Sequence, residues 1–536
     1  MRELARDRWL VVLVLAWAAF SVASIWLRPL WPVDETRYAS VAWEMWLRGD
    51  FLVPHVNGEP YSHKPPLLFW LMHLGWAVFG VSEWWPRLLA PLCAFAALLL
   101  LQYLARLLWP AERAVGVAAA WVLFGTLLFA AFVTLTMFDL LLMLCVMIGA
   151  VGMVRASRGE PRAGFLWLGA ALGLGVLAKG PVVLLHVLPV ALAAPWWAAA
   201  ARTAPARWYP GLLAAVVLGA AIALAWALPA GHFGGEEYRR AIFWGQTAGR
   251  VAESFAHRAP WWYYLPLLPL VLFPWLLWPA LWRGLRAVEF GAGNSGARFL
   301  AAWIVLTLAA FSFVSGKQAK YLLPMLPAFA LLAGYALTRP MAPARGWEML
   351  PPAIAYLAIP AVLGLARARP EALELPEWSA LLPVWTIAAS ALAFPALLAF
   401  ARRATMAQAR ALGFATFGTI LVIGAGVVPS IVRYGDPRPA AEHLAELQRL
   451  GIPLAHLGKY HAQYNFVGRL RTPIEILDQP ELAPWVAAHP AGQVIVVERK
   501  RYARDGPGPG YESPFRGAWV QVWAGEALLA AREKPR

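Results

Sequence analysis

The chain has 536 residues, of which 60% are hydrophobic and 14% charged, and its formal net charge is +16. Soluble domains carry about 25% charged residues, so this composition excludes a soluble protein and predicts a polytopic membrane protein. The positive charge would suit anionic lipid head groups, and nothing in the sequence indicates nucleic-acid binding.

About thirteen apolar segments are long enough to cross a membrane as helices. The first is too long, and followed by too many others, to be a cleaved signal peptide, so we expect it to remain as a helix. The predicted spans are 9–28, 86–108, 113–132, 136–154, 163–178, 180–198, 209–229, 262–283, 299–315, 321–338, 350–366, 379–401 and 411–432.

Arginines predict the orientation of these spans in the membrane. The N-terminus carries Arg2, Arg6 and Arg8, and the positive-inside rule places such an end in the cytoplasm. Alternate loops are also basic, and an odd number of spans then puts the C-terminal tail in the periplasm. The basic loops contain Arg106, Arg113, Arg155, Arg158, Arg162, Arg202, Arg207, Arg283, Arg286, Arg298, Arg339, Arg345, Arg402, Arg403 and Arg410.

The composition divides the chain into two predicted domains. Residues 1–434 form a transmembrane domain with a large first outer loop at 29–85, and residues 435–536 form a soluble α/β domain on the outer side. Within the loop, the apolar stretch 67–80 is too short for a span and predicts an interfacial or re-entrant hairpin. In the tail we expect a helix at Pro437–Leu450 and strands at Val494–Glu498 and Trp519–Trp523.

Lysines have a different distribution from arginines. The chain has only seven, and none falls in the predicted cytoplasmic loops. Four of these lysines lie on the outer side, where the positive-inside rule does not explain them. Binding of an anion such as a lipid phosphate explains them directly. The alternative is snorkelling at helix ends. The four outer lysines are Lys64, Lys179, Lys317 and Lys320.

Two adjacent carboxylates, Asp34 and Glu35, follow the first span in the run W-P-V-D-E-T-R-Y. Ionisable groups at this depth mark functional sites, although a solvated charged loop is the alternative. Because consecutive helical side chains diverge by about 100°, we expect only one to face a pocket. We assign the chemistry to Asp34 and a partnership with Arg37 or Lys64 to Glu35.

Further polar groups gather on the same predicted face. Asp139 begins the span 136–154, where the alternative role is a carboxylate favoured by the helix dipole. A carboxylate site ringed by cations suits a reaction on a phosphorylated lipid. The loop at 231–260 supplies more groups, namely Arg240, Arg250, His257 and Arg258. Cys93 and Cys145 both lie inside spans, so the sequence gives no disulfide or metal-thiolate signature.

Several motifs resemble those of bacterial dolichyl-phosphate-mannose-protein-mannosyltransferase-like enzymes, and most of all the aminoarabinose transferases of lipid A. The resemblance covers nearly the whole chain and implies the glycosyltransferase C fold. Its motifs are D-E-T-R-Y-A-S-V-A-W-E-M, G-D-F-L-V-P, Y-S-H-K-P-P-L-L-F-W, L-A-K-G-P, A-H-R-A-P-W-W-Y-Y-L-P, G-K-Q-A-K-Y-L-L-P-M-L-P and Y-H-A-Q-Y-N-F-V-G-R-L.

The resemblance implies inverting transfer of a sugar from undecaprenyl phosphate to a lipid A phosphate. Asp34 matches the catalytic acidic residue of the family's first outer loop, and Asp139 matches its second essential aspartate. We add Glu35 to this catalytic set. The expected carrier-phosphate ligands are Lys64, Arg250, Tyr321, Arg258, Lys179 and Lys320. A phosphate acceptor needs no general base, so Asp34 would stabilise the cationic sugar, whereas a hydroxyl acceptor would make it a base.

One residue departs from the family pattern. The residue before the loop lysine is often Glu in the aminoarabinose enzymes and is His63 here, which weakens a metal site assigned by analogy. A divalent metal near His63 or His257 stays open as an alternative, although ordinary loop histidines are the more common case. The sugar stays open too.

Other functions also stay open. One alternative is transfer of another polyprenyl-phosphate-linked sugar to a protein or glycan. Another is a flippase or transporter of polyprenyl-linked glycans, although transporters place polar residues near the bilayer midplane, and here only His186 lies there. A non-catalytic scaffold would leave the charges at the membrane without a role.

Overall fold

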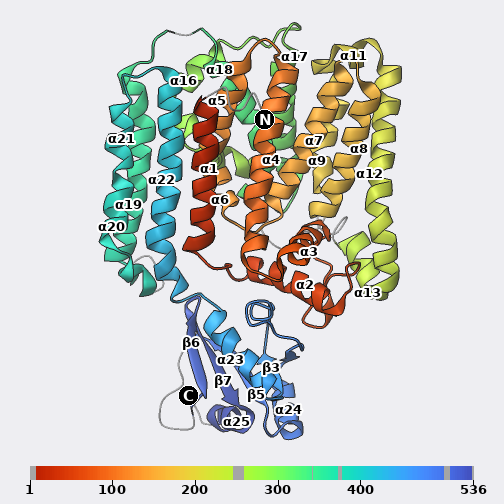
Figure 1. Cartoon of the computed structure of the whole chain (residues 1–536), viewed down its shortest axis with the longest axis vertical. Helices are drawn as coiled ribbons and strands as arrows, with labels where there is room; N and C mark the ends of the chain where they lie inside the picture. The colour runs from red at the N-terminus through yellow and green to blue at the C-terminus, as the bar shows by residue number, and fades with distance from the viewer. Residues whose placement is uncertain (1–7, 246–258, 341, 372–376, 500–507, 534–536) are drawn as a thin grey trace.

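The computed structural model describes residues 8–245, 259–340, 342–371, 377–499 and 508–533. A broad bundle of helices carries a small sheet domain at one end (Figure 1). The helix α1 starts at the opposite end of the bundle and runs toward the sheet domain.

Within the described residues, nine helical segments are long and apolar enough to cross a membrane. Each coincides with one of the predicted spans. They are Arg8–Leu27 (α1), Trp84–Leu108 (α4), Asp139–Ser157 (α7), Pro161–Lys179 (α8), Pro205–Phe233 (α12), Ser295–Phe313 (α17), Ala319–Leu337 (η5 Ala319–Met325 with α18 Leu326–Leu337), Gly346–Ala368 (η6 Gly346–Met349 with α19 Leu350–Ala368) and Thr405–Val432 (α22).

The other four predicted spans are helical but interrupted. The span predicted at 113–132 is a pair of helices bent by 73°. In the other three, prolines such as Pro189 and Pro274 remove backbone donors and favour shorter pieces. The pieces are α5 (Arg113–Phe124), α6 (Leu127–Val133), α9 (Val182–Leu192), α10 (Ala194–Trp197), η3 (Trp261–Tyr263), α15 (Tyr264–Val271), η4 (Trp275–Leu277), α16 (Pro279–Arg286), η8 (Glu377–Leu381), α20 (Val384–Ala391) and α21 (Ala393–Ala399).

Short elements join the spans at both ends of the bundle. At the end away from the sheet domain, Arg283 is ion-paired with Glu348 and Arg339 with Glu112, so predicted basic loops lie together there. The remaining short helices are α11 (Ala199–Thr203), α13 (Gly235–Arg240) and η2 (Ala241–Gly245).

The first outer loop folds against the other end of the bundle. It contains α2 (Asp34–Arg48), the hairpin β1 (His55–Val56) with β2 (Glu59–Pro60), and α3 (Leu67–Phe79). With 13 residues, α3 is shorter than a span, and α2 and α3 lie across the bundle end (Figure 1).

The motif G-D-F-L-V-P marks where α2 ends. Gly49 adopts φ +65°, the left-handed conformation that commonly ends a helix. The Asp50 carboxylate then accepts hydrogen bonds from the N–H groups of Leu52 and Val53 at 2.9 and 3.1 Å. This part of the motif therefore shapes the chain for reasons of backbone geometry.

The C-terminal domain is a five-stranded sheet in the order β4-β3-β5-β7-β6. Parallel pairing joins β3 to β4 and to β5, and antiparallel pairing joins β7 to β5 and to β6. The helix and the two strands expected in the tail correspond to α23, β5 and β7. The elements are α23 (Arg438–Arg449), β3 (Leu454–Leu457), β4 (Glu475–Leu477), η9 (Gln479–Glu481), α24 (Leu482–Ala488), β5 (Gln493–Glu498), β6 (Tyr511–Phe515), β7 (Ala518–Ala524) and α25 (Gly525–Glu533).

A segment of this domain is attached directly to α2. The buried Ser40 hydroxyl donates to the Ala462 carbonyl oxygen at 2.7 Å and accepts from the Phe466 N–H at 3.0 Å. The Trp43 indole donates to the Leu470 carbonyl oxygen at 2.9 Å. The motif Y-H-A-Q-Y-N-F-V-G-R-L therefore forms the contact between the two domains, and it brings the sheet domain against the first outer loop.

Candidate active site

Asp34 is the first residue of α2, and its carboxylate is accessible. Its side chain is 45% exposed, and its Oδ1 lies 2.5 Å from Nη2 of Arg37, one helical turn further on. A negative charge at the start of a helix is favoured by the helix dipole. Asp34 is therefore placed as a carboxylate that a ligand can reach.

Glu35, the next residue, points into the protein. Its side chain is 3% exposed and forms an ion pair with Arg28 at the end of α1, with one Nη2–Oε1 contact of 2.8 Å. It also accepts from the backbone N–H groups of Trp31, at 2.7 Å, and of Thr136. The divergence of the two neighbours is as expected, but the prediction that Arg37 or Lys64 pairs with Glu35 is wrong. Arg37 instead pairs with Asp34.

The surroundings of Glu35 favour its charged form. Burial raises the pKa of this carboxyl, but Arg28 and the two backbone N–H groups outweigh burial and hold the pKa below its ordinary value. All of these contacts are internal, so Glu35 is a positioning residue for the start of α2. The assignment of Glu35 to the catalytic set is not supported by this geometry.

Asp139 is the first residue of α7, and a cation is in direct contact with it. Its side chain is 3% exposed, and Oδ1 lies 2.5 Å from Nζ of Lys179, the last residue of α8. The same Nζ lies 5.4 Å from the ring centroid of Tyr321. Three of the predicted residues, distant in sequence, therefore form one cluster.

Lys64 lies beside this cluster. Its Nζ is 5.9 Å from the ring of Phe138, the residue before Asp139. The Phe138 ring also meets the ring of Tyr38, edge to face, at 4.9 Å. Phe138 thus contacts both the lysine of the first outer loop and Tyr38 of α2.

The Tyr38 phenol is affected by the charges of both carboxylates, Asp34 and Asp139. Burial raises the pKa of its phenol, and the negative charges of Asp34 and Asp139 raise the pKa further. Both carboxylates are therefore near Tyr38. Sequence reasoning did not single out this tyrosine, although it lies four residues after Asp34, a spacing that puts the two side chains on one helix face.

The C-terminal domain contributes a histidine to the same region. Burial lowers the pKa of His461, and the positive charges of Arg37, Lys459 and Arg516 lower it further, while Asp34 acts in the opposite direction. At neutral pH His461 is therefore a neutral imidazole. Its place near Asp34 follows from the attachment of the next residue, Ala462, to α2.

The other predicted cations have different positions. Lys320 is half-buried in η5, and Lys317, from the outer lysine set, donates to the Ala259 carbonyl oxygen at 3.0 Å. Arg240 pairs with Glu236 at 3.1 Å on the exposed helix α13. Two predicted phosphate ligands, Arg250 and Arg258, lie outside the described residues, as does His257.

The histidines that the structure describes lie in no metal-binding cluster. His63 is exposed, with its ring 5.2 Å from that of Tyr61. Among the described residues, no group of three His, Cys, Asp or Glu side chains is placed to hold a metal ion.

His186 is buried in α9, and its ring centroid lies 4.7 Å from that of Phe311. The Phe311 ring centroid in turn lies 5.9 Å from that of Tyr321.

The combined geometry suits transfer of a group from a phosphate ester. Lys179, Lys64 and Tyr321 provide two cations and a phenol for a phosphate. Asp34 provides an accessible carboxylate near Tyr38, whose ring contacts Phe138. Such a pairing can hold a leaving phosphate and stabilise positive charge on the group being transferred.

Comparison with known proteins decides the family. The chain is 33% identical over 455 residues to the undecaprenyl phosphate-alpha-4-amino-4-deoxy-L-arabinose arabinosyl transferase of Pseudomonas paraeruginosa, covering 82% of this chain and 80% of the relative. The chain belongs to this arabinosyl transferase family. The enzyme of the same description from Pseudomonas aeruginosa is 34% identical over 69% of this chain and 68% of its own length.

Two further comparisons concern part of the chain and its fold. Residues 63–226 match the model of the dolichyl-phosphate-mannose-protein mannosyltransferase family. The crystal structure of ArnT from Cupriavidus metallidurans bound to undecaprenyl phosphate has a TM-score of 0.75 at 20% identity, covering 96% of this chain and 97% of that one. The predicted fold class, a helical membrane bundle of glycosyltransferase C type with a C-terminal α/β domain, is confirmed, and the protein is a membrane-embedded glycosyltransferase.

We predict that Glu35→Gln destabilises this arabinosyl transferase family member. Breaking a buried ion pair leaves the Arg28 charge without compensation, which costs about 3–5 kcal/mol. The thermal unfolding of the purified variant in detergent measures the loss. Asp34→Asn, one residue away and half exposed, is the matched control and is expected to unfold close to wild type.

The same prediction has a pH dependence. Because the folded-state pKa of Glu35 is depressed, its stabilisation is fully present above the unfolded value of about 4.3. It is lost as the pH falls through the lower folded value. The difference between wild type and Glu35→Gln should be constant from neutral pH to about pH 5 and shrink only below that. Equal unfolding temperatures at neutral pH would refute the positioning role.

Proposed function

We propose that this protein transfers 4-amino-4-deoxy-L-arabinose from undecaprenyl phosphate to a phosphate of lipid A. The observation that carries the proposal is the cluster of Asp139, Lys179 and Tyr321, with Lys64 on the adjacent Phe138. The sugar and carrier are named in the descriptions of relatives that cover most of the chain. Lipid A is the acceptor that family membership implies.

In this proposal the cations bind the carrier phosphate. As the bond between the sugar and the phosphate oxygen breaks, its electron pair moves to the phosphate, whose negative charge grows. Lys64 and Tyr321 donate to this phosphate, and Lys179, held at Asp139, adds a second positive charge. Donors fixed before the reaction stabilise the developing charge without reorganisation.

Asp34 acts on the opposite charge. Positive character develops on the sugar as the phosphate leaves, and an ionised carboxylate nearby lowers its energy. The acceptor phosphate attacks from the side opposite the leaving group, which inverts the anomeric centre. An anionic acceptor needs no proton removed, so Asp34 works by electrostatics, and Arg37 at 2.5 Å orients it.

We further propose that the end of the bundle carrying α2, α3 and the sheet domain faces the periplasm. The arginine-rich loops lie at the other end, where Arg283 and Arg339 form their ion pairs, and the positive-inside rule assigns that end to the cytoplasm. The N-terminus is then cytoplasmic and the C-terminus periplasmic.

The function is tested with purified protein in lipid nanodiscs, undecaprenyl-phosphate aminoarabinose and lipid A. We expect a mass increase of the lipid A corresponding to one sugar. Asp34→Asn should abolish turnover while leaving carrier binding intact, because the carboxylate acts chiefly in the transition state. Glu59→Gln, an exposed carboxylate of the same outer loop, is the control. Wild-type rates in Asp34→Asn would refute the role, and transfer only to another acceptor would refute lipid A.

Binding of the carrier provides a separate test. Lys64→Ala should weaken binding of undecaprenyl phosphate and of the sugar-loaded donor equally, by about 1.5–3 kcal/mol for a lost charged hydrogen bond. Titration of the purified variant measures both affinities, with the exposed Arg471→Ala as control. Unchanged carrier affinity with weakened lipid A affinity would move Lys64 to the acceptor side.

Orientation is tested by cysteine labelling of intact cells. The two native cysteines, Cys93 and Cys145, are buried, so a membrane-impermeant maleimide should react only with introduced ones. We expect labelling at Ala487→Cys, exposed on α24, and none at Thr203→Cys, exposed on α11 at the other end of the bundle. The reverse pattern would place the whole site in the cytoplasm.

A further inference from the structure

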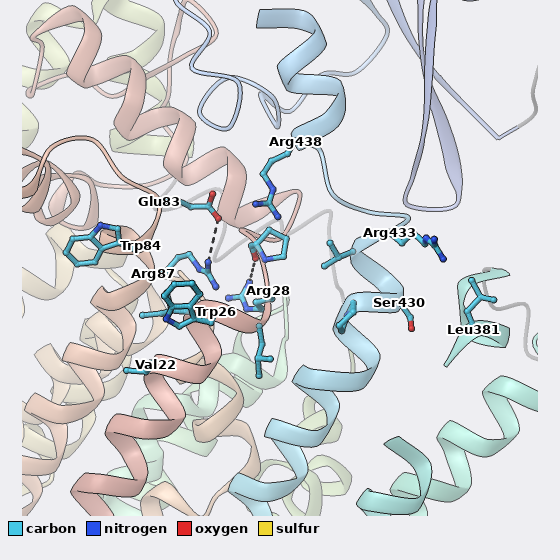
Figure 2. A pocket seen from close by; sticks show the side chains of 15 residues that line it. Val22, Trp26, Arg28, Glu83, Trp84, Arg87, Leu381, Ser430, Arg433 and Arg438 are labelled. Carbon is cyan, nitrogen blue, oxygen red and sulfur yellow. Dashed lines mark hydrogen bonds and ion pairs between the residues drawn. The ribbon is translucent and has the colours of Figure 1, made fainter. Parts of the chain in front are cut away.

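A cavity of about 1080 Å³ lies where α1, α4 and α22 meet the C-terminal domain (Figure 2). The end of α1, the start of α4 and the end of α22 form most of its wall, and Arg438 of α23 completes it. Asp34, Lys64 and Asp139 are not among the residues that line it. It is therefore a different space from the candidate active site.

Three guanidinium groups converge in this cavity. Arg28, Arg87 and Arg438 come from α1, α4 and α23 and point toward one another in Figure 2. Glu83 is the acidic residue of the lining set. Arg28 and Arg438 are both close enough to act electrostatically on Arg87. Arg28 pairs with Glu35 and Arg438 with Asp436, whereas Arg87 lies 3.6 Å from Glu83, so an anion at this point would compensate chiefly the charge of Arg87.

The internal partners of Arg87 and Arg438 do not use all their donors, whereas both terminal nitrogens of Arg28 are occupied by Pro29, Glu35 and Thr134. A guanidinium has five N–H donors. Arg87 donates to the Ser24 carbonyl oxygen at 3.0 Å, but its closest approach to Glu83 is a long 3.6 Å. Arg438 pairs with its near neighbour Asp436 while remaining half-exposed. Both can offer further donors to a ligand, and arginine is suited to phosphate oxygens.

The rim of the cavity is apolar and faces the membrane side of the bundle. Trp26 is 84% exposed, and Trp84 and Val22 are exposed as well. Tryptophans of this kind lie at the level of lipid head groups. A ligand with an anionic head and hydrocarbon chains would contact the arginines and the apolar rim together.

We propose that this cavity binds the phosphorylated head group of an outer-leaflet lipid other than the polyprenyl carrier. Arg87 and Arg438 hold the phosphate beside Arg28, and the acyl chains lie along Trp26 and Trp84. The inference does not depend on which sugar the enzyme transfers.

The position of the cavity connects this lipid to the active site. Arg28 lines the cavity and also donates to Glu35 and to the Thr134 carbonyl oxygen. Glu35 follows Asp34 directly at the start of α2. A phosphate on Arg87 and Arg438 would also bridge the transmembrane and C-terminal domains.

Lipid binding to the purified full-length protein is the test. Native mass spectrometry or titration is carried out with bis-phosphorylated lipid A, fully dephosphorylated lipid A, phosphatidylglycerol and inorganic phosphate. Arg87→Gln and Arg438→Gln should each weaken binding of a phosphorylated lipid at least tenfold and leave undecaprenyl phosphate affinity unchanged. Arg433→Gln is the matched control, because its guanidinium points away from the other three in Figure 2. Because Arg438 is half-exposed, Arg438→Gln tests the site even if Arg87→Gln impairs folding. Thermal unfolding of both variants measures any loss of stability.

The outcomes separate the sources of the phosphate. Selective binding of bis-phosphorylated lipid A, or equal binding of phosphatidylglycerol, supports the site and tells which lipid occupies it. Dephosphorylated lipid A binding as tightly as the phosphorylated form overturns it, as does inorganic phosphate binding as tightly as either lipid. Equal loss of undecaprenyl phosphate binding in both variants would make the cavity part of the donor site and would also overturn the proposal.

Discussion

The buried ion pair between Arg28 and Glu35 holds the first outer loop in place. It joins the end of α1 to the start of α2, and through the Thr136 N–H it also joins the segment that leads to Asp139. Uncompensated burial of either charge would cost several kcal/mol, against a total stability of about 5–15 kcal/mol for a typical folded protein. Because Asp34 is the neighbour of Glu35, and Asp139 follows Thr136 by three residues, this one pair fixes the backbone beneath both candidate catalytic carboxylates.

Because of helical periodicity, different faces of α2 contact the candidate active site, the helical bundle and the C-terminal domain. Asp34, Arg37 and Tyr38 share one face and turn toward the candidate active site. Glu35 turns toward the bundle. Ser40 and Trp43, three residues apart, turn toward the C-terminal domain. The side chains of a helix at i, i+3 and i+4 lie together, so a rigid rod of 15 residues can set the relative positions of the reacting carboxylate, the bundle and the soluble domain.

Local rules of sequence were sufficient for much of this architecture. Hydropathy and length located the nine helical segments that, within the described residues, can cross a membrane, and the lysine distribution pointed to Lys64 and Lys179 near the site. The charge pattern also singled out Asp139, and the resemblance gave Asp139 and Tyr321 their expected roles. Local sequence spacing could not predict the partner of Glu35. Arg28 lies seven residues away across a turn, and tertiary packing determines that Glu35 pairs with Arg28 and not with Arg37. The approach of His461 to Asp34 depends on a domain contact more than 400 residues apart in sequence. Hydropathy identified the apolar segments that prolines interrupt, but it carries no information on where a helix bends.

The Ser40 contact with the C-terminal domain also has a consequence for biosynthesis. Its partners lie 422 and 426 residues further along the chain, and translation proceeds at about 5–20 residues per second. Roughly 20–80 s therefore separate the emergence of α2 from the emergence of its partner. During that interval the helix is in place without the soluble domain, and His461 is missing from the neighbourhood of Asp34. The site is completed only when the last part of the polypeptide has been made and delivered to the same side of the membrane, so partially synthesised chains lack a finished pocket in which to react with the lipids around them.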